Sequence, residues 1–326
     1  MTVVTAAAVQ HAPVFLDRDA TIDKGVLLIA EAARGGADIV AFPETWVPCY
    51  PLWVFGGTQW EDPRGKDSYA RLLANSVLVG SESTDRLCRA AREHRVHVVL
   101  GINELEPGSR GTIYNSLLTI SPRGEILGVH RKIMPTHAER VVWGAGDGST
   151  LHVYDTELGR LGGLICWEHW MPLTRFAMHA KGEQIHVAAW PEMPEIHHLA
   201  SRHYAFEGRC FVICAGSYLT VDMVPEELRE AALGGQIGDD ASVLLPGGSG
   251  IIGPDASWIA GPAGNEETIV YGDMDLDQIP REFGSLDAAG HYNRPDIFQL
   301  TVDARPRRQI LWLESDVEAD VGNTGS

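Results

Sequence analysis

Short apolar runs alternate with amphipathic segments along most of this 326-residue chain, and that alternation constrains the fold more than any other feature. Residues 3–10 and 38–42 have the apolar, β-branched composition of strands. Residues 19–34, between them, repeat apolar side chains at helical spacing. The same reasoning predicts strands over 96–102, 112–120, 125–130, 151–156, 160–166, 185–190, 210–219, 249–254, 257–262 and 267–275, and helices over 68–76, 83–95, 172–181 and 197–209. Strands that alternate with helices and hairpins indicate an α/β protein.

No linker, internal repeat or change in composition divides the chain before its end. A folded chain of 35.5 kDa buries roughly three quarters of its surface, which is enough for a large core. We therefore expect one domain over residues 1–290. Residues 291–326 show little periodicity and end in an acidic stretch, so we expect them to form a C-terminal extension that is partly disordered.

Charge and cysteine content narrow the range of partners. The chain has 44 acidic and 26 basic side chains and a net charge of −18, which argues against a nucleic-acid or membrane-surface partner. Five cysteines without a Cys-x-x-Cys pair favour a reducing, cytoplasmic location. No apolar stretch reaches the length of a membrane span, and the N-terminus lacks the basic start of a signal peptide.

Three reactive side chains follow apolar strands at the same kind of position. DIVAF leads into Pro43-Glu44, EILGVH leads into Arg131-Lys132, and LGGLI leads into Cys166. If these strands are parallel neighbours, the three side chains emerge at one edge of a sheet. Ligand and catalytic sites in α/β proteins form at the carboxyl ends of strands. The pattern therefore predicts a site that combines a carboxylate, an ammonium and a thiol.

Those three groups have complementary chemistry. A thiol becomes a strong nucleophile as the thiolate, and a nearby ammonium such as that of Lys132 lowers its pKa. We expect Glu44 to accept the thiol proton and then to activate water. Lys132, with the backbone N–H of Trp167, would stabilise the negative charge that develops on the substrate. We expect the glycine pair 162–163 to let the backbone turn sharply, and a helix after Cys166 to direct its dipole at the sulfur.

Each residue also has a structural explanation when it is taken alone. A cysteine after an apolar strand is often a small core residue. A glutamate after Phe-Pro is commonly a loop carboxylate, and a lysine after His-Arg is commonly solvated. The wider motifs around these residues decide between the two interpretations.

Those motifs resemble the nitrilase superfamily, and within it the true nitrilase branch. The resembling segments are AFPETWVPCYP, HRKIMPTHAERVVWGAGDGS, LGGLICWEHWMPLTRFAMHAKGEQIHVAAWP, SRHYAFEGRCFVICAG and GHYNRPDIF. The resemblance implies a four-layer α-β-β-α sandwich over the predicted domain. It implies a catalytic triad of Glu44, Lys132 and Cys166, with a second glutamate at Glu139. It also implies homo-oligomers, from dimers to spirals, with the C-terminal extension at an interface.

The activity that the resemblance implies is hydrolysis of a small neutral nitrile, with water as co-substrate, to a carboxylic acid and ammonia. The route passes through a thioimidate and a thioester on Cys166 and needs no cofactor. Trp167, Trp190, Pro191 and Trp53 are the expected substrate-binding residues, and their aromatic character suggests an aryl or arylaliphatic nitrile. Alternatives within the superfamily are an amidase or carbamoylase and a cyanide- or nitrile-hydrating enzyme. A more distant alternative is a non-catalytic assembly protein.

Two other kinds of site also fit parts of the sequence. His169 or His137 could serve as the base of a Cys–His hydrolase, although a spacing of three residues sets His169 away from the sulfur. A metal site could form from His197, His198, His203, Cys210 and Cys214. The chain has no H-E-x-x-H or Cys-x-x-Cys motif, so we expect no metal.

Overall fold

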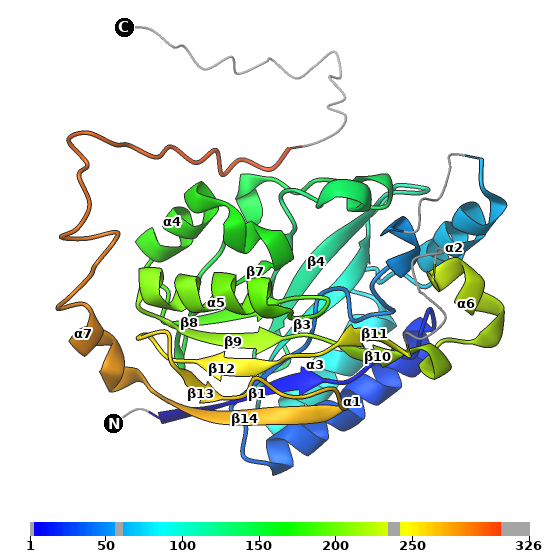
Figure 1. The fold of residues 1–326 in the computed structure, drawn as a ribbon, viewed down its shortest axis with the longest axis horizontal. Coiled ribbons are helices and arrows are strands. Elements are labelled where there is room, and N and C mark those ends of the chain that lie inside the picture. Colours follow the sequence, from blue (N-terminus) through cyan, green and yellow to red (C-terminus); the bar gives the residue numbers. More distant parts are fainter. Residues whose placement is uncertain (1–2, 56–60, 234–241, 308–326) are drawn as a thin grey trace, which may run out of the picture.

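Two six-stranded sheets face each other in the computed structural model, which describes residues 3–55, 61–233 and 242–307 (Figure 1). The strand order in the first sheet is β14-β1-β2-β3-β4-β5, and in the second it is β13-β12-β9-β8-β7-β6. The strands are β1 (Val3–Gln10), β2 (Ile39–Ala41), β3 (His97–Leu105), β4 (Ile113–Ile120), β5 (Ile126–Arg131), β6 (Tyr154–Thr156), β7 (Gly159–Ile165), β8 (Ile185–Ala189), β9 (Phe211–Ala215), β12 (Gly250–Ile252), β13 (Trp258–Ala260) and β14 (Thr268–Asp275). A separate hairpin joins β10 (Tyr218–Thr220) and β11 (Val243–Pro246).

Helices cover the outer faces of both sheets and complete four layers. The helices are α1 (Arg18–Arg34), α2 (Pro63–Ala74), α3 (Glu82–His94), α4 (Pro172–Ala180), α5 (Glu195–Gly208), α6 (Glu226–Leu233) and α7 (Ile279–Glu282). The pair α1 and α3 packs on the first sheet, and α4 and α5 pack on the second (Figure 1). The predicted α/β class and α-β-β-α sandwich are therefore confirmed.

The alternation of side chains along β1 shows why the sheets stack in this way. Val4, Ala6 and Ala8 point into the core between the two sheets. Ala7 and Val9, on the other face of the strand, join the core beneath α1 and α3. Successive residues of a strand point to opposite faces, so the continuous apolar run over residues 6–9 must be covered on both sides.

The structure departs from the predicted elements in several places. The single strand predicted over 210–219 is two strands in different sheets, β9 and β10. The segment after Cys166 is a short 3₁₀ helix, η4 (Cys166–Trp170), and α4 begins only at Pro172. The strand β11 was not predicted from the sequence. No helix among the described residues has the length and apolar composition that crossing a bilayer requires.

The C-terminal extension forms no helix or strand over residues 291–307, and the acidic stretch at 314–320 lies outside the described residues. The division at residue 290, the homo-oligomer and the cytoplasmic location stay predictions.

Candidate active site

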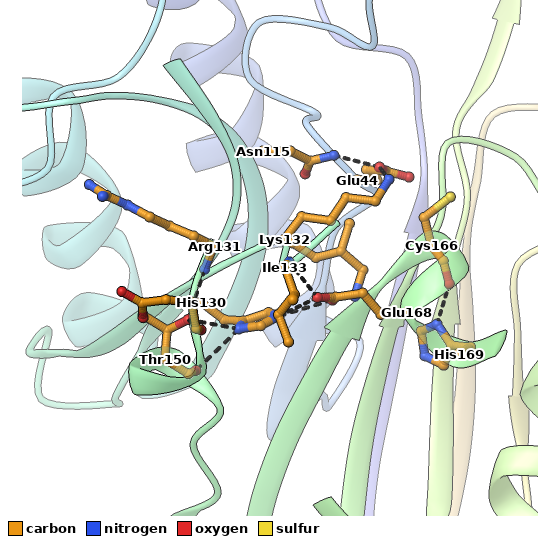
Figure 2. A network of polar contacts seen from close by, with 12 residues as sticks. Glu44, Asn115, His130, Arg131, Lys132, Ile133, Thr150, Cys166, Glu168 and His169 are labelled. Atoms are coloured by element: carbon orange, nitrogen blue, oxygen red, sulfur yellow. Dashed lines mark hydrogen bonds and ion pairs between the residues drawn. The ribbon is translucent and has the colours of Figure 1, made fainter. Parts of the chain in front are cut away.

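The predicted base, lysine and thiol lie together at one edge of the sandwich, although they come from two sheets. Glu44 follows β2 and Lys132 follows β5, and these strands share the first sheet with β3 and β4 between them. Cys166 follows β7, which belongs to the second sheet. The expectation of three neighbouring strands in one sheet is therefore wrong. The side chains meet because stacking places the strand ends of one sheet beside those of the other (Figure 2).

Backbone hydrogen bonds hold these strand ends in place. The N–H of Glu44 donates to the carbonyl oxygen of Trp190, which follows β8 in the second sheet (3.1 Å). Asn115, in β4, accepts from the N–H of Lys132 (2.8 Å) and donates from Nδ2 to Glu44 Oε1 (2.6 Å). Gly101, in β3, leaves room for the loop that carries Glu44, because a Cβ there would lie 2.2 Å from a backbone oxygen of that loop.

Lys132 bridges two buried carboxylates. Its Nζ lies 2.8 Å from Glu44 Oε1 and 2.7 Å from Glu139 Oε2. The Tyr50 hydroxyl donates to Glu139 Oε1 at 2.6 Å, which fixes the second carboxylate. One oxygen of Glu44, one oxygen of Glu139 and Cys166 Sγ lie within 4.8 Å of one another. The four predicted catalytic residues therefore form one cluster.

Burial sets the protonation of this cluster. It raises the pKa of Glu44 to about 7, against the opposing charge of Lys132 and with a contribution from Glu139. Burial, reinforced by the charge of Glu44, also raises the pKa of Cys166 well above the usual thiol range. Burial disfavours the charged form of Lys132, but the surrounding anionic groups outweigh it and raise the pKa of the ammonium.

The resting site is thus a neutral thiol beside an ammonium that stays charged. Lys132 does lower the pKa of the Cys166 thiol, as expected, but burial and the charge of Glu44 outweigh that effect. Glu44 Oε2 has no hydrogen-bond partner within the described part of the chain. It is therefore available to take the thiol proton when a substrate arrives.

Glu168 connects the strand that carries the lysine to the strand that carries the cysteine. Its carboxylate accepts from the N–H of Ile133, next to Lys132, and from the N–H of Ile165, next to Cys166, both at 2.8 Å. His130 Nε2 lies 2.9 Å from Glu168 Oε2 (Figure 2). Burial raises the pKa of Glu168, but the charge of His130 and these hydrogen bonds outweigh it and lower that pKa. Sequence analysis assigned Glu168 no role. A glutamate three residues after a strand end, where it can cap the next helix, was the available signal.

The backbone at Cys166 is held in an uncommon conformation. Its φ of +53° lies in the left-handed region, which costs a non-glycine residue about 1–3 kcal/mol. The preceding glycine pair 162–163 does not turn the chain, because both residues lie within β7. The missing side chains make room instead. A Cβ at Gly162 would lie 1.9 Å from the Glu183 carboxylate, and one at Gly163 would lie 2.8 Å from Leu117 of the facing sheet.

His169 contacts the backbone of Cys166, and its other ring nitrogen is also engaged. Nδ1 lies 2.7 Å from the Cys166 carbonyl oxygen, and Nε2 lies 2.9 Å from His186 Nε2. Figure 2 shows the sulfur on the opposite side of the cysteine from the ring. This geometry does not support His169 as the base of a Cys–His pair.

A cavity of about 880 Å³ opens in front of Cys166 and Glu139. Most of its lining is apolar or aromatic. The lining residues are Tyr50, Leu52, Phe55, Met134, Thr136, His137, Glu139, Arg140, Cys166, Trp167, Trp170, Met171, Pro191, Glu192, Pro194, His197, Leu244 and Leu245. Trp167 is 51% exposed, which places it at the mouth of the cavity. Glu44 and Lys132 are buried and are not part of the lining.

Two of the four predicted substrate-binding residues lie elsewhere. Trp167 and Pro191 line the cavity, whereas Trp190 and Trp53 do not. Trp190 is fully buried and stacks between the rings of His169 and His197, with centroids 4.9 and 4.1 Å away. Trp53 packs in a separate core, because its 3₁₀ helix, η1 (Leu52–Phe55), directs it inward. Phe55, on the same helix, lines the cavity instead.

Metal ligation fits the described residues poorly at this position. One group of three potential ligands occurs among them, formed by Glu44, Glu139 and Cys166. The Lys132 ammonium already pairs with both carboxylates, so a cation there would face a like charge. The histidines considered for a metal site are engaged separately. His197 Nδ1 lies 2.9 Å from the Glu192 carbonyl oxygen, and His198 Nε2 lies 2.8 Å from that of Gly248.

A thiol beside a carboxylate base and a fixed ammonium is an arrangement that cysteine hydrolases use. The chain matches the family model described as carbon-nitrogen hydrolase over residues 5–281. It is 42% identical over 316 residues to a protein named Nitrilase 2 from an unknown prokaryotic organism, with 97% of each chain covered. It is 38% identical over 330 residues to an aliphatic nitrilase from Rhodococcus rhodochrous, covering 96% of this chain and 82% of that one.

Among solved structures, the fold resembles that of a carbon–nitrogen hydrolase from Helicobacter pylori G27. The TM-score is 0.72 at 21% identity, with 91% of this chain and 97% of that chain covered. The chain belongs to the carbon–nitrogen hydrolase family, and within it to the nitrilase branch. It is therefore a hydrolase of carbon–nitrogen bonds, as the sequence motifs predicted.

Proposed function

We propose that this protein hydrolyses an organic nitrile to a carboxylic acid and ammonia, with Cys166 as the nucleophile. The observation that carries the proposal is the Lys132 ammonium, which pairs with Glu44 and Glu139 while Cys166 Sγ lies within 4.8 Å of both carboxylates. This arrangement supplies a nucleophile, a proton acceptor and a fixed positive charge in one buried cluster.

The first half of the reaction forms a thioimidate. The thiol proton passes to Glu44 as the Cys166 Sγ–carbon bond forms, and the nitrile carbon–nitrogen π bond gives its electron pair to nitrogen. Lys132 and the Trp167 N–H stabilise that nitrogen, which then takes the proton from Glu44 and leaves Glu44 ready to act again as a base. The fixed ammonium needs no reorganisation at this moment, and such preorganised charges give the largest benefit in a dry site.

The second half consumes two waters. Glu44 removes a proton from the first water, which adds to the thioimidate carbon, and ammonia leaves to give a thioester on Cys166. A second water attacks the thioester by the same base catalysis, releases the acid and returns the thiol. Loss of the thiol before ammonia would give an amide instead. A pKa near 7 suits Glu44 to both roles, since it must accept and return protons at neutral pH.

An aryl or arylaliphatic nitrile suits the cavity. Tyr50, Phe55, Trp167 and Trp170 contribute aromatic surface to its lining, and nitriles are neutral, so the net charge of −18 does not repel them. An aliphatic nitrile is the second candidate, because one of the similar proteins is named an aliphatic nitrilase. A cavity of about 880 Å³ has room for either class.

Ammonia release tests the proposal across phenylacetonitrile, benzonitrile, mandelonitrile, an aliphatic dinitrile, cyanide and phenylacetamide. We expect phenylacetonitrile to react fastest and the amide to react slowly. Faster reaction of the dinitrile would move the substrate class to aliphatic nitriles. Faster reaction of the amide would make the protein an amidase, and no ammonia from any compound would favour a non-catalytic role. The Cys166→Ala variant is the negative control.

A further inference from the structure

A chain of buried side chains leads from the backbone of Cys166 away from the cavity. His169 Nδ1 lies 2.7 Å from the Cys166 carbonyl oxygen, and His169 Nε2 lies 2.9 Å from His186 Nε2. His186 Nδ1 lies 2.7 Å from Glu183 Oε1, and the Tyr204 hydroxyl donates to Glu183 Oε2 at 2.6 Å. The four residues of this hydrogen-bond chain are at most 3% exposed, so each of their polar atoms depends on its neighbour for a hydrogen bond.

The chemistry of the carbonyl fixes where the hydrogens lie. A carbonyl oxygen only accepts, so His169 Nδ1 carries a hydrogen. With His169 neutral, its Nε2 must accept, and the hydrogen in the next contact belongs to His186 Nε2. With His186 also neutral, its Nδ1 accepts as well, and Glu183 donates as the protonated acid.

Moving that proton from Glu183 to His186 or His169 gives the alternative arrangements, and each of them is also neutral overall. The chain therefore holds one proton beyond the two neutral imidazoles. Burial favours the arrangement without charges, because it raises the pKa of Glu183 to about 7 and lowers the pKa values of His186 and His169 well below their usual range.

The first hydrogen bond of this chain orients a functional peptide group. In a trans peptide, the C=O and N–H point in opposite directions within one plane. His169 holds the Cys166 oxygen on the side of the core, so the N–H of the same peptide, that of Trp167, points the other way. Cys166 and Trp167 both line the cavity. The Trp167 N–H lies in the first turn of η4, where N–H groups have no acceptor within the helix.

The neighbours of the chain hold it rigidly. Trp190 stacks on the His169 ring, with centroids 4.9 Å apart and planes 25° apart, and donates from Nε1 to Ser201. The Tyr204 ring stacks on His186 at 3.9 Å. Gly162 gives the Glu183 carboxylate the space it occupies, since a Cβ there would lie 1.9 Å from Oε1.

We propose that Glu183, His186 and His169 are positioning residues that aim the Trp167 N–H at the substrate atom that gains negative charge. The inference rests on the proposed nitrile hydrolysis and assigns the chain to that reaction. Hydrogen-bond chains also polarise their members, so the bond to the Cys166 oxygen makes the N–H on the same peptide a stronger donor. The benefit appears when charge develops on the substrate, so it belongs to kcat and not to KM.

The sharpest test compares His169→Leu with His169→Asn. Leucine removes the donor to the Cys166 oxygen, whereas the Asn Nδ2 occupies nearly the position of the His Nδ1. We expect His169→Leu to lower kcat by about 10- to 100-fold with little change in KM. Removal of such a donor costs about 10²–10³, and here the Trp167 N–H remains but loses the contact that orients it. His169→Asn should recover most of that loss.

Inhibition by phenylacetaldehyde and by butanal provides a readout that a merely structural role would not change. Cys166 Sγ adds to the aldehyde carbon, the thiol proton passes to Glu44, and the oxygen becomes an anion in the place of the substrate nitrogen. In His169→Leu, the inhibition constant should rise by the factor by which kcat/KM falls. In His169→Asn, it should return toward the wild-type value. Unchanged aldehyde binding in a folded His169→Leu, or a His169→Asn variant as slow as His169→Leu, would overturn the proposal.

A second pair keeps the test valid if His169→Leu does not fold. Glu183→Gln can donate to His186 and accept from Tyr204 as the protonated acid does, whereas Glu183→Leu can do neither. Nitrogen NMR of the wild-type histidines should show hydrogen on His169 Nδ1, and hydrogen found only on its Nε2 would refute the chain. NMR and aldehyde binding need no turnover, so they separate failure of this inference from failure of nitrile hydrolysis.

Discussion

Two buried carboxyl groups, Glu44 and Glu183, have pKa values that burial raises to about 7, yet their surroundings differ. Glu44 pairs with the Lys132 ammonium and keeps one oxygen without a hydrogen-bond partner among the described residues. Both oxygens of Glu183 are engaged, one by His186 and the other by Tyr204. A pKa near neutrality therefore does not by itself identify the catalytic base. Glu44 is distinguished by this oxygen without a partner and by a carboxylate that lies within 4.8 Å of the Cys166 sulfur.

The two clusters also differ in how they tolerate charge. Around Lys132, two carboxyl groups lie against one cation, whose charge offsets theirs. Along the histidine chain, one shared proton keeps the whole assembly neutral. The first arrangement supplies a fixed field for chemistry, and the second supplies rigidity without a buried charge.

Exchange of each carboxyl for an amide gives the largest expected contrast. Glu44→Gln should lower kcat by about 10²–10⁴-fold, because an amide cannot accept the thiol proton. Glu183→Gln preserves the hydrogen-bonding pattern of the protonated acid and should stay within about threefold of wild type, well below the effect of a lost donor. Ammonia release from the best nitrile, with circular dichroism as the check on folding, measures both. Equal losses in the two variants would show that the comparison is mistaken.

Replacement of Lys132 should lower the stability of the protein more than replacement of one side chain in the buried histidine chain. Lys132→Met leaves Glu44 and Glu139 buried without a cation, which should lower the free energy of unfolding by about 3–5 kcal/mol. Tyr204→Phe leaves one oxygen of Glu183 without its donor and should cost about 1–3 kcal/mol. Urea unfolding measures both. The Lys132→Met deficit should be smaller near pH 5 than near pH 8, because acid neutralises one carboxylate, and a deficit that grows on acidification would contradict this picture.

The histidine chain should also affect how stability depends on pH. Glu183 has a pKa of 4.5 when unfolded and about 7 when folded, among His186, Tyr204 and the nearby His179. Its contribution is complete below the unfolded pKa and is lost as the pH rises toward the folded pKa. Between about pH 5 and pH 7, wild type should therefore lose about 2 kcal/mol relative to Glu183→Gln, whose amide does not titrate. A constant difference between the two would mean that Glu183 is ionised throughout.

The sequence predicted the elements of the fold better than their partners. Strands such as β1, β3 and β9 could be located from local composition, and helix α1 could be located from local periodicity. Which strands pair, and in which sheet, depends on contacts between distant segments. That is why Glu44, Lys132 and Cys166 were expected from neighbours in one sheet, although β2, β5 and β7 lie in two.

The site shows the same division between local and distant information. Glu44, Lys132 and Cys166 could be located because each follows an apolar strand and lies in a recognisable motif. The roles of Glu168 and His169 depend on contacts with other strands, which the sequence does not display. The raised pKa of the Cys166 thiol depends on burial. Trp190 lies outside the cavity lining because it stacks on His169, a contact between segments that are distant in the sequence.

The smallest predicted effect concerns the strained backbone at Cys166, which sequence analysis also could not foresee. At φ +53° glycine is favoured over alanine, so Cys166→Gly should be more stable than Cys166→Ala by up to about 1 kcal/mol, although both are inactive. Cys214 provides the matched control because it is fully buried in the extended strand β9. There glycine should be less stable than alanine by about 0.5–1 kcal/mol. Urea unfolding of the four variants would reveal the opposite signs, and the same sign at both positions would show that the strain at Cys166 has no energetic weight.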